Sequence, residues 1–222
     1  MTECDVVIPC RDEAAALPSV LSRVPGGFRA IVVDNGSTDG TGDVARAAGA
    51  TVVVENVRGY GAAVDAGVRA ASAPYVGVLD GDGSMDPLSL TALLSDVRDG
   101  AATMAVGRRR PTDPRVWPWH ARAGTAALAW LIRRRSGLAI HDLAPMRVCR
   151  REDLVALDVR DRRFGYPLEL MVKAARQGWT VRETDIEYER RAAGTRSKVS
   201  GSVRGTALTV LDFAGVLREV RR

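Results

Sequence analysis

The sequence predicts an α/β fold in which a mostly parallel sheet is flanked by helices. Of its 222 residues, 46% are hydrophobic and 27% are charged, which is typical of a folded globular protein. Short apolar runs alternate with helical patterns through the first half, as in parallel sheets covered by helices. A chain of this length buries roughly 70% of its unfolded surface, so its core needs no disulfide or metal.

The first half of the chain, residues 1–107, supplies five predicted strands with helices between them. The strands are short apolar runs at residues 6–8, 30–33, 51–54, 75–79 and 103–106. The helices have apolar residues three or four apart, at about residues 17–24, 43–48, 61–71 and 88–94. Pro87 suits the first turn of the fourth helix.

The second half, residues 108–222, has a different character. A basic crossing with two prolines, residues 108–114, leads to an amphipathic helix over residues 117–135. A strand at 146–149, a helix at 167–176 and a strand at 181–188 follow. Residues 190–201 are polar and basic without a period, which predicts a loop that is mobile until a ligand binds, and a final helix spans about 203–220.

The two halves also differ in charge. Residues 1–107 hold 7 arginines against 14 acidic residues, whereas residues 108–222 hold 25 basic against 13 acidic residues. A basic half indicates a phosphate-bearing partner: a nucleic acid, an anionic lipid or a phosphorylated small molecule. Nucleic acid is the weakest of these, because only 5% of residues are aromatic and no recognition motif is present.

The chain is expected to be cytoplasmic. Its three cysteines, Cys4, Cys10 and Cys149, form no close pair, which favours packing roles in a reducing compartment. Its start lacks the pattern of a signal peptide, and no apolar run approaches the ~18 residues of a membrane span. His120 and His141 have no partners at metal-ligand spacing.

Polar and charged side chains follow four of the predicted strands, at the edge where parallel sheets bind ligands. They are Arg11, Asp12 and Glu13, then Asp34 and Asp39, then Asn56 and Arg58, and finally Asp80, Asp82 and Asp86. A surface turn supplies one or two acidic residues by chance, but here the same edge supplies them repeatedly. We therefore expect a site at this edge.

Asp80-Gly81-Asp82 is the most specific element of this edge. Two carboxylates one residue apart at a strand end can face one divalent cation, while Gly81 and Gly83 let the backbone approach a ligand. An ordinary Asp-Gly turn has the same local sequence. The position after a strand, beside the other acidic residues, favours a site for Mg²⁺ or Mn²⁺.

The stretch Gly59-Tyr60-Gly61 is not a dinucleotide fingerprint, because it lacks the third glycine and follows the third strand. A helix that begins here, after Arg58, offers backbone N–H groups to an anion or a base edge. A tight turn between strand and helix explains the same glycines equally well.

Taken together, the motifs resemble those of family 2 glycosyltransferases with the GT-A fold, a Rossmann-like α/β architecture. Residues 7–13, 32–41, 58–63 and 80–82 look like its successive nucleotide and metal motifs. Later stretches are similar to the branch with dolichyl-phosphate mannose synthases and bacterial polyprenyl-phosphate glycosyltransferases; these are residues 117–120, 141–147, 169–170 and 191–198. The resemblance spans nearly the whole chain and implies one domain over residues 1–222, with the nucleotide-sugar half at 1–107 and the acceptor half at 108–222.

The resemblance also assigns roles to individual residues. Those that would bind the nucleotide sugar are Pro9, Arg11, Glu13, Asp34, Arg58, Gly61, Asp80, Gly81 and Asp82, with Asp80 and Asp82 holding the metal. Those that would bind phosphate or acceptor are Arg109, Arg122, Arg147, Arg191, Ser197 and Lys198. Two departures from the pattern are Ser84, where relatives often have Gln, and Pro145-Met146, which replaces Gly-Phe.

The implied reaction is inverting transfer of a sugar from a GDP- or UDP-sugar. A polyprenyl phosphate acceptor is already anionic and needs no general base, and the excess of arginine in the second half favours it. A hydroxyl acceptor needs a carboxylate to take its proton, and Asp142 is then the candidate base. Asp142 and Asp82 are thus the expected catalytic residues.

Three other functions compete with this interpretation, and the sequence argues against two of them. A nucleotidyltransferase would need a glycine- and arginine-rich first loop, and a phosphatase would carry its Asp-x-Asp after the first strand. A nucleotide-sugar-binding protein without activity stays open. So does the role of the helix with Trp117, Trp119 and Trp130, which suits either peripheral contact at the inner face of a membrane or ordinary packing on a sheet.

Overall fold

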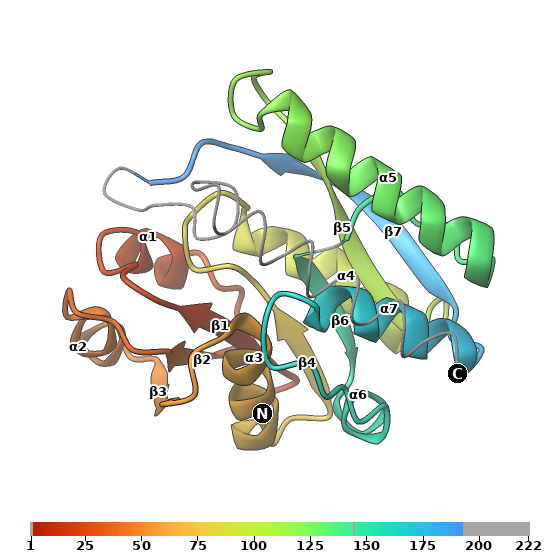
Figure 1. Cartoon of the computed structure of the whole chain (residues 1–222). Coiled ribbons are helices and arrows are strands. Elements are labelled where there is room, and N and C mark those ends of the chain that lie inside the picture. Colours follow the sequence, from red (N-terminus) through yellow and green to blue (C-terminus); the bar gives the residue numbers. More distant parts are fainter. Residues whose placement is uncertain (1, 144, 193–222) are drawn as a thin grey trace.

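A computed structural model describes residues 2–143 and 145–192 of the chain (Figure 1). Its strands form one sheet in the order β3-β2-β1-β4-β6-β5-β7. The strands are β1 (Cys4–Cys10), β2 (Phe28–Asp34), β3 (Thr51–Val54), β4 (Tyr75–Val78), β5 (Met104–Pro111), β6 (Met146–Arg150) and β7 (Val181–Tyr188). The helices are α1 (Leu17–Ser22), α2 (Thr41–Ala47), α3 (Tyr60–Ala70), the 3₁₀ turn η1 (Pro87–Ser89), α4 (Leu90–Arg98), α5 (Trp119–Ser136), α6 (Arg151–Ala156) and α7 (Tyr166–Arg176).

The predicted α/β class and the mostly parallel sheet are confirmed. Strands β3, β2, β1 and β4 run parallel, and β5 runs parallel to β7. The exception is β6, which lies antiparallel between β4 and β5. Strands from both halves of the chain thus share one sheet, which places the acidic and the basic halves side by side.

Apolar residues cover both faces of the sheet because strand side chains alternate in direction. Val7 faces a cluster formed with Val64 and Val68 of α3 and with α7. Its neighbours Val6 and Ile8 face the opposite cluster, which includes α1 and α4. The helix α3 lies especially close to β1, since a Cβ on Gly67 would come 2.3 Å from Val7 Cγ1. The rigid layers fix the loops at the strand ends.

Three features of the second half differ from the sequence prediction. The segment 108–111, expected as a basic crossing, continues β5 because it pairs in register with residues 185–188 of β7. The short helix α6 was not predicted; it follows β6 directly. The amphipathic helix begins at Trp119 and not at Trp117. The predicted loop beyond residue 192 and the final helix lie outside the described residues.

One buried charge lies at the amino ends of the strands, away from the candidate site. Asp5 is fully buried and accepts hydrogen bonds from Arg29 Nε at 2.7 Å and Nη2 at 2.8 Å. The backbone N–H groups of Ser72 and Ala73 donate to the same carboxylate. Burial works against the charged form, but the arginine and the two amides outweigh it and lower the pKa of Asp5. This ion pair ties β1, β2 and the start of β4 together.

Candidate functional site

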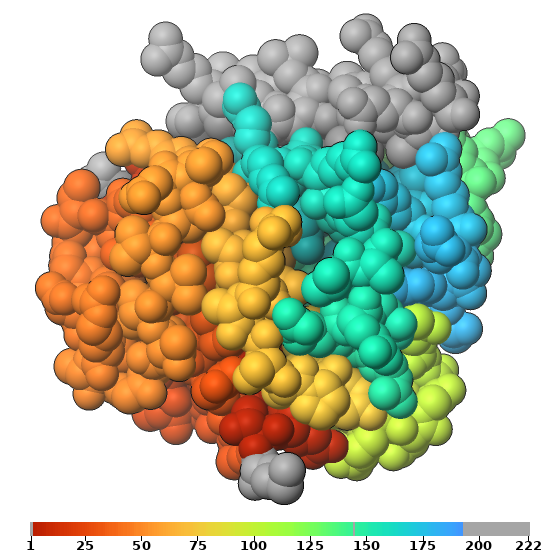
Figure 2. Space-filling model, turned by 90° about the horizontal axis from the view of Figure 1, so that it is seen from below, coloured from red at the N-terminus to blue at the C-terminus, as the bar shows by residue number. Residues whose placement is uncertain are grey.

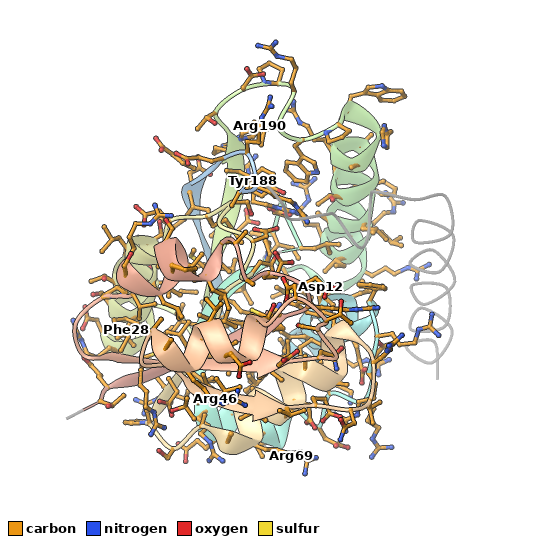
Figure 3. The ribbon with its side chains drawn as sticks, turned by 90° about the vertical axis from the view of Figure 1, so that its left-hand side faces the viewer. Asp12, Phe28, Arg46, Arg69, Tyr188 and Arg190 are labelled. Carbon is orange, nitrogen blue, oxygen red and sulfur yellow. The ribbon has the colours of Figure 1, made fainter. Side chains whose placement is uncertain are left out.

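The residues predicted as a site gather at one edge of the sheet. Strands β1 and β2 end in register at Cys10 and Asp34, and the parallel strands β3 and β4 end on the same side. Figure 3 shows Asp12 beyond this edge and Phe28 at the opposite one. The segments 11–13, 34–41, 55–59 and 79–86 therefore form neighbouring loops, as predicted.

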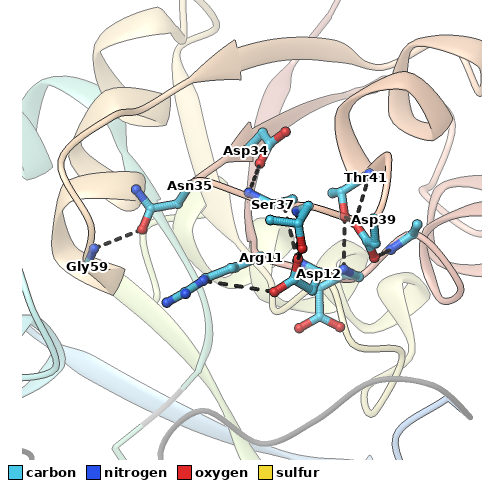
Figure 4. Close-up of polar contacts among 11 residues, drawn as sticks. Arg11, Asp12, Asp34, Asn35, Ser37, Asp39, Thr41 and Gly59 are labelled. Atoms are coloured by element: carbon cyan, nitrogen blue, oxygen red, sulfur yellow. Dashed lines mark hydrogen bonds and ion pairs between the residues drawn. The ribbon is translucent and has the colours of Figure 1, made fainter.

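The loops after β1 and β2 are joined by hydrogen bonds (Figure 4). Asp12 has φ 54°, a left-handed conformation that is uncommon outside glycine. Its carboxylate accepts from Thr38 N at 2.8 Å. The N–H of Glu13 donates to Thr41 Oγ1 at 3.0 Å, and Glu13 itself is buried. Arg11 lies beside this junction, half exposed, with its Nε 4.0 Å from Asp12 Oδ2. These contacts hold the strained Asp12 backbone in place.

The loops after β2 and β3 are joined by Asn35, which is buried. Its Nδ2 donates to Glu55 O at 2.9 Å and to Val57 O at 2.8 Å, and its Oδ1 accepts from Gly59 N at 2.8 Å. Sequence reasoning quoted this residue only as part of a motif. These three hydrogen bonds of the Asn35 side chain fix the loop that carries the exposed Arg58.

Asp34 keeps part of its carboxylate available at the end of β2. Its Oδ1 accepts from Ser37 N at 2.9 Å, and the side chain is half-buried. Gly42 leaves room beside Oδ2, since a Cβ there would come 3.0 Å from that oxygen. Pro9, one residue before the end of β1, is also half-buried. Asp34 is therefore placed to accept an N–H from a ligand.

The amides at the start of α3 are already hydrogen-bonded. Gly61 N donates to Arg163 O at 3.1 Å, and Ala62 N donates to Arg162 O at 2.9 Å. A Cβ on Gly61 would come 2.1 Å from Asp161 O, so only glycine fits here. Figure 2 shows the segment around residues 150–165, in teal, packed against the α3 region, in orange and yellow. Of the two explanations that the sequence left open, close packing accounts for Gly59 and Gly61, because the amides at the start of α3 are not free to bind an anion.

Glu169 of α7 holds the segment around residues 160–163 that packs against the start of α3. Its carboxylate accepts from Arg160 N at 3.0 Å and Asp161 N at 2.7 Å, and it pairs with Lys173 Nζ at 2.8 Å. Burial raises the pKa of Glu169, but Lys173 and the two amides outweigh burial and lower it. The Glu169 carboxylate thus stabilises the loop on which the start of α3 rests.

Asp80 and Asp82 lie together at the end of β4. Asp82 is buried, and its Oδ1 accepts from Ser84 N at 3.0 Å and Ser84 Oγ at 2.6 Å. Gly81 between them is required, because a Cβ would come 2.5 Å from Cys10 Sγ. Ser84, at the position where relatives often have Gln, therefore orients the Asp82 carboxylate through two hydrogen bonds.

The carboxylate pair has the properties of a cation site. Burial and then the charge of Asp82 raise the pKa of Asp80 to about 7. In the described part of the chain, no hydrogen bond to the Asp80 carboxylate offsets this cost, and no cluster of three or more His, Cys, Asp or Glu side chains occurs. Two carboxylates fit a hard divalent cation that takes its other ligands from phosphate oxygens and water.

Three arginines act electrostatically on Asp80: Arg191, Arg109 and Arg147. Arg147 is 1% exposed; its Nη2 donates to Tyr60 Oη at 3.1 Å, and its guanidinium stacks over Tyr166. It supplies charge from within the core. Arg122 is exposed on α5, and Ser197 and Lys198 lie outside the described residues.

Arg109 and Asp142 form a two-pronged ion pair. Arg109 Nε donates to Asp142 Oδ2 at 2.8 Å, and Nη2 donates to Oδ1 at 2.6 Å. Asp142 also accepts from Arg109 N at 3.0 Å and Leu143 N at 2.7 Å. A carboxylate with four N–H donors must give up hydrogen bonds before it takes a proton. The arrangement orients Arg109 and opposes the expected role of Asp142 as a base.

The sequence analysis named Trp117 but did not place it beside this ion pair, and it singled out neither Tyr188 nor Glu183. The guanidinium of Arg109 lies 4.0 Å from the ring centroid of Trp117 and 5.4 Å from that of Tyr188. Glu183 of β7 contacts the turn that carries Asp142. Nothing in the local sequence signals these contacts, which depend on the pairing of β5 with β7.

Comparison with known proteins identifies the family to which this chain is similar. The model of glycosyl transferase family 2 matches residues 5–154. An uncharacterized glycosyltransferase of Mycobacterium tuberculosis is 53% identical over 212 residues, which cover 96% of both chains. The polyprenol monophosphomannose synthase of Mycolicibacterium smegmatis is 34% identical over 217 residues, which cover 89% of this chain and 81% of that protein.

A solved structure shares the fold. The glucosyl-3-phosphoglycerate synthase of Mycobacterium tuberculosis, in complex with Mn²⁺, uridine diphosphate and glucosyl-3-phosphoglycerate, matches with a TM-score of 0.75. The match covers 98% of this chain and 79% of that one, at 23% identity. The predicted GT-A architecture is thereby confirmed.

Proposed function

Since the chain belongs to glycosyltransferase family 2, we propose that it moves a sugar from a GDP- or UDP-sugar to a polyprenyl phosphate. The observation that carries this choice of acceptor is the ion pair of Arg109 and Asp142. It fixes an arginine beside the carboxylate pair and occupies the carboxylate that a hydroxyl acceptor would need as a base. An acceptor that is already an anion needs an arginine to bind it but needs no general base.

The donor binds at the carboxyl ends of β1 to β4. Asp34 accepts an N–H from the base, and Pro9, Arg11, Glu13, Arg58 and Gly61 shape the pocket for the nucleoside. Asp80, Gly81 and Asp82 lie at the diphosphate. The half-buried Asp34 carboxylate at the end of β2 and the hydrogen-bonded loops around Asn35 support this assignment.

The carboxylates Asp80 and Asp82 hold Mg²⁺ or Mn²⁺, which offsets the charge that builds up on the leaving diphosphate. Support comes from the placement of the two carboxylates side by side, where burial and then the charge of Asp82 raise the pKa of Asp80 to about 7. The related glucosyl-3-phosphoglycerate synthase was crystallised with Mn²⁺ and uridine diphosphate. Arg191 Nε lies 3.0 Å from Asp82 Oδ2, and Arg191 neutralises phosphate charge there.

In the reaction, an oxygen of the acceptor phosphate forms a bond to the anomeric carbon of the sugar. The bond from that carbon to the diphosphate oxygen breaks at the same time, so the configuration inverts and the nucleoside diphosphate leaves as an anion. No proton has to be removed from the acceptor. Arg109 binds the acceptor phosphate, with Arg122, Ser197 and Lys198 as further contacts, and the buried Arg147 adds positive potential.

Helix α5 provides the contact with the lipid. Trp119 is 79% exposed and Trp130 is 52% exposed, and no acidic residue occurs in the helix. Arg133, Arg134 and Arg135 follow in its last turn. Exposed tryptophans beside arginines suit the interface of an anionic membrane, so we place the enzyme peripherally at the inner membrane face. Within residues 2–143 and 145–192, no helix is both long and apolar enough to cross a bilayer.

The test is transfer of radiolabelled sugar from a panel of GDP- and UDP-sugars with Mn²⁺. Farnesyl phosphate serves as a short acceptor, and farnesol and 3-phosphoglycerate serve as controls. Transfer to farnesyl phosphate alone is expected. Transfer to 3-phosphoglycerate or farnesol in its place would favour a hydroxyl acceptor, and nucleotide-sugar binding without any transfer would favour a binding protein.

The membrane contact has its own test, sedimentation with vesicles that contain anionic lipid. The double variant W119A/W130A is expected to bind about tenfold more weakly than wild type. V155A removes a residue that is 50% exposed on α6 and serves as the matched control. Equal binding of the wild type and the double variant would contradict the interfacial position.

A further inference from the structure

Glu183 connects strand β7 to the turn at residues 141 and 142. Its Oε1 accepts from His141 N at 2.6 Å and from Asp142 N at 3.0 Å. Its Oε2 lies 2.8 Å from His141 Nδ1. The Glu183 side chain is 8% exposed although it carries a charge. Three contacts to one turn therefore offset the cost of burying this carboxylate.

The anchored turn determines where the Asp142 carboxylate lies. Asp142 receives three hydrogen bonds from Arg109, two from the guanidinium and one from the backbone. Its own backbone N–H is held by Glu183. A fork of two parallel hydrogen bonds fixes both the position and the plane of a guanidinium. The orientation of Arg109 thus depends on Glu183 through Asp142.

Aromatic rings complete the setting of Arg109. Trp117 covers the guanidinium at 4.0 Å, and Tyr188 lies at 5.4 Å. The side chain is 16% exposed. In the described part of the chain, no residue accepts a hydrogen bond from Arg109 Nη1. The hydrogen bonds to Asp142 run through Nε and Nη2, so Nη1 is the remaining nitrogen of the guanidinium.

We propose that Glu183 is a positioning residue for acceptor binding: it fixes the turn that aims Arg109 Nη1 at the acceptor phosphate. The inference rests on the proposed function for the role of Arg109 and adds to it the residue that sets its geometry. Glu183 does not itself touch the ligand. It pairs in register with Val106, three residues before Arg109 in β5, and acts through residues 141 and 142.

Three variants separate positioning from general stability. Glu183→Ala removes both backbone anchors, whereas Glu183→Gln keeps an oxygen that accepts from the two amides. Glu187→Ala is the matched control, because Glu187 is an exposed glutamate on the same strand. The readouts are the KM for farnesyl phosphate and the Kd for a nucleoside diphosphate with Mn²⁺, measured by calorimetry.

We expect Glu183→Ala to raise the KM for farnesyl phosphate about tenfold, because small displacements of a binding group are costly. The Kd of the Mn²⁺ nucleoside diphosphate stays within about twofold, and Glu183→Gln recovers most of the loss. The inference is overturned if the acceptor KM does not change, or if acceptor and diphosphate affinities fall together.

A double variant tests the route through Arg109. Arg109→Gln should raise the acceptor KM by about 10- to 100-fold, the range for loss of a charged hydrogen bond. In that background Glu183→Ala should add less than about twofold, because both changes act on one contact. Additive effects would refute the route. An acceptor KM unaffected by Arg109→Gln would instead refute the proposed acceptor site.

A spectroscopic readout does not depend on the acceptor. The Nε–H of Arg109 is held by Asp142 and should give a slowly exchanging ¹⁵N NMR signal, identified by its loss in Arg109→Gln. Glu183→Ala should shift and broaden this signal, and Glu183→Gln and Glu187→Ala should keep it. An unchanged signal in Glu183→Ala would contradict the proposal even if farnesyl phosphate is not the substrate.

Discussion

Arg191 Nε lies 3.0 Å from Asp82 Oδ2, so an arginine neutralises the carboxylate that we assign to the metal. The backbone holds it there, because Ala192 N donates to Asp82 O at 3.0 Å and Glu189 N donates to Ser84 O at 2.9 Å. The segment after β7 is thereby bound to the loop after β4. If Asp80 and Asp82 hold a cation as proposed, the cation would compete with Arg191 for Asp82, and Arg191 would then be available to the diphosphate.

This competition predicts opposite effects of Arg191→Gln on two ligands. Mn²⁺ alone should bind about three- to tenfold more tightly, because a competing positive charge is lost. The nucleoside diphosphate with Mn²⁺ should bind about tenfold more weakly, because a charged hydrogen bond to phosphate is lost. Electron paramagnetic resonance of free Mn²⁺ and calorimetry measure the two affinities.

The control for this prediction is Arg190→Gln, which changes the adjacent exposed arginine and should alter neither affinity. If both affinities move in the same direction in Arg191→Gln, the arginine acts only as part of the general positive field and does not exchange with the cation.

Asp82→Asn should reduce the metal-dependent affinity for the nucleoside diphosphate by at least about 100-fold. The amide oxygen can still accept from Ser84, so the loop is expected to keep its shape and the melting temperature to change little. What the variant removes is a charged ligand for a hard cation. Calorimetry with and without Mn²⁺ measures the effect.

Asp86→Asn provides the comparison in the same loop, since Asp86 caps the η1 turn through Leu88 N and pairs with Arg23 at 3.7 Å. Equal losses in the two variants, or an unchanged affinity in Asp82→Asn with Mn²⁺ present, would remove Asp82 from the metal site.

The first half of the site could be predicted because it follows from local patterns. Apolar runs locate the ends of β1, β2 and β4, and parallel pairing then brings Asp34, Asp80 and Asp82 to one edge. The extent of β5 could not be predicted, because its basic residues are strand residues only through pairing with β7. Local sequence carries no information on a partner so far along the chain.

The same limit explains the contacts of Asp142. Its partner Arg109 lies 33 positions earlier in the chain. Glu183, which accepts from the backbone N–H of Asp142, lies 41 positions later. Sequence reasoning identified both Asp142 and Arg109 as site residues but had no means to pair them. The resemblance made Asp142 the candidate base for a hydroxyl acceptor, and its pairing with Arg109 argues against that role.

Asp5 predicts how the fold responds to acid. Because the folded state lowers the pKa of Asp5, this carboxylate stabilises the fold above its unfolded pKa of about 3.9. Its contribution is lost as the pH falls through the lower pKa of the folded state.

Asp5→Asn should therefore destabilise the protein by about 2 kcal/mol near pH 7. In urea unfolding, the difference between variant and wild type should shrink below about pH 4; a constant difference from pH 7 to pH 3 would show that charge is not the cause.

Asp142→Asn distinguishes a positioning role from a role as general base. If Asp142 only orients Arg109, the variant raises the acceptor KM about tenfold, because an amide holds a guanidinium less firmly than a carboxylate does. Its kcat then falls less than about tenfold, and the pH profile of kcat keeps its shape. Loss of a general base would instead lower kcat by about 10²- to 10⁴-fold and abolish the acidic limb of the profile. Steady-state kinetics from pH 5 to pH 9 decide between the two, with Asp185→Asn on the exposed side of β7 as the control for a lost Arg partner. A large fall in kcat with an unchanged acceptor KM would restore Asp142 as the base and, with it, a hydroxyl acceptor.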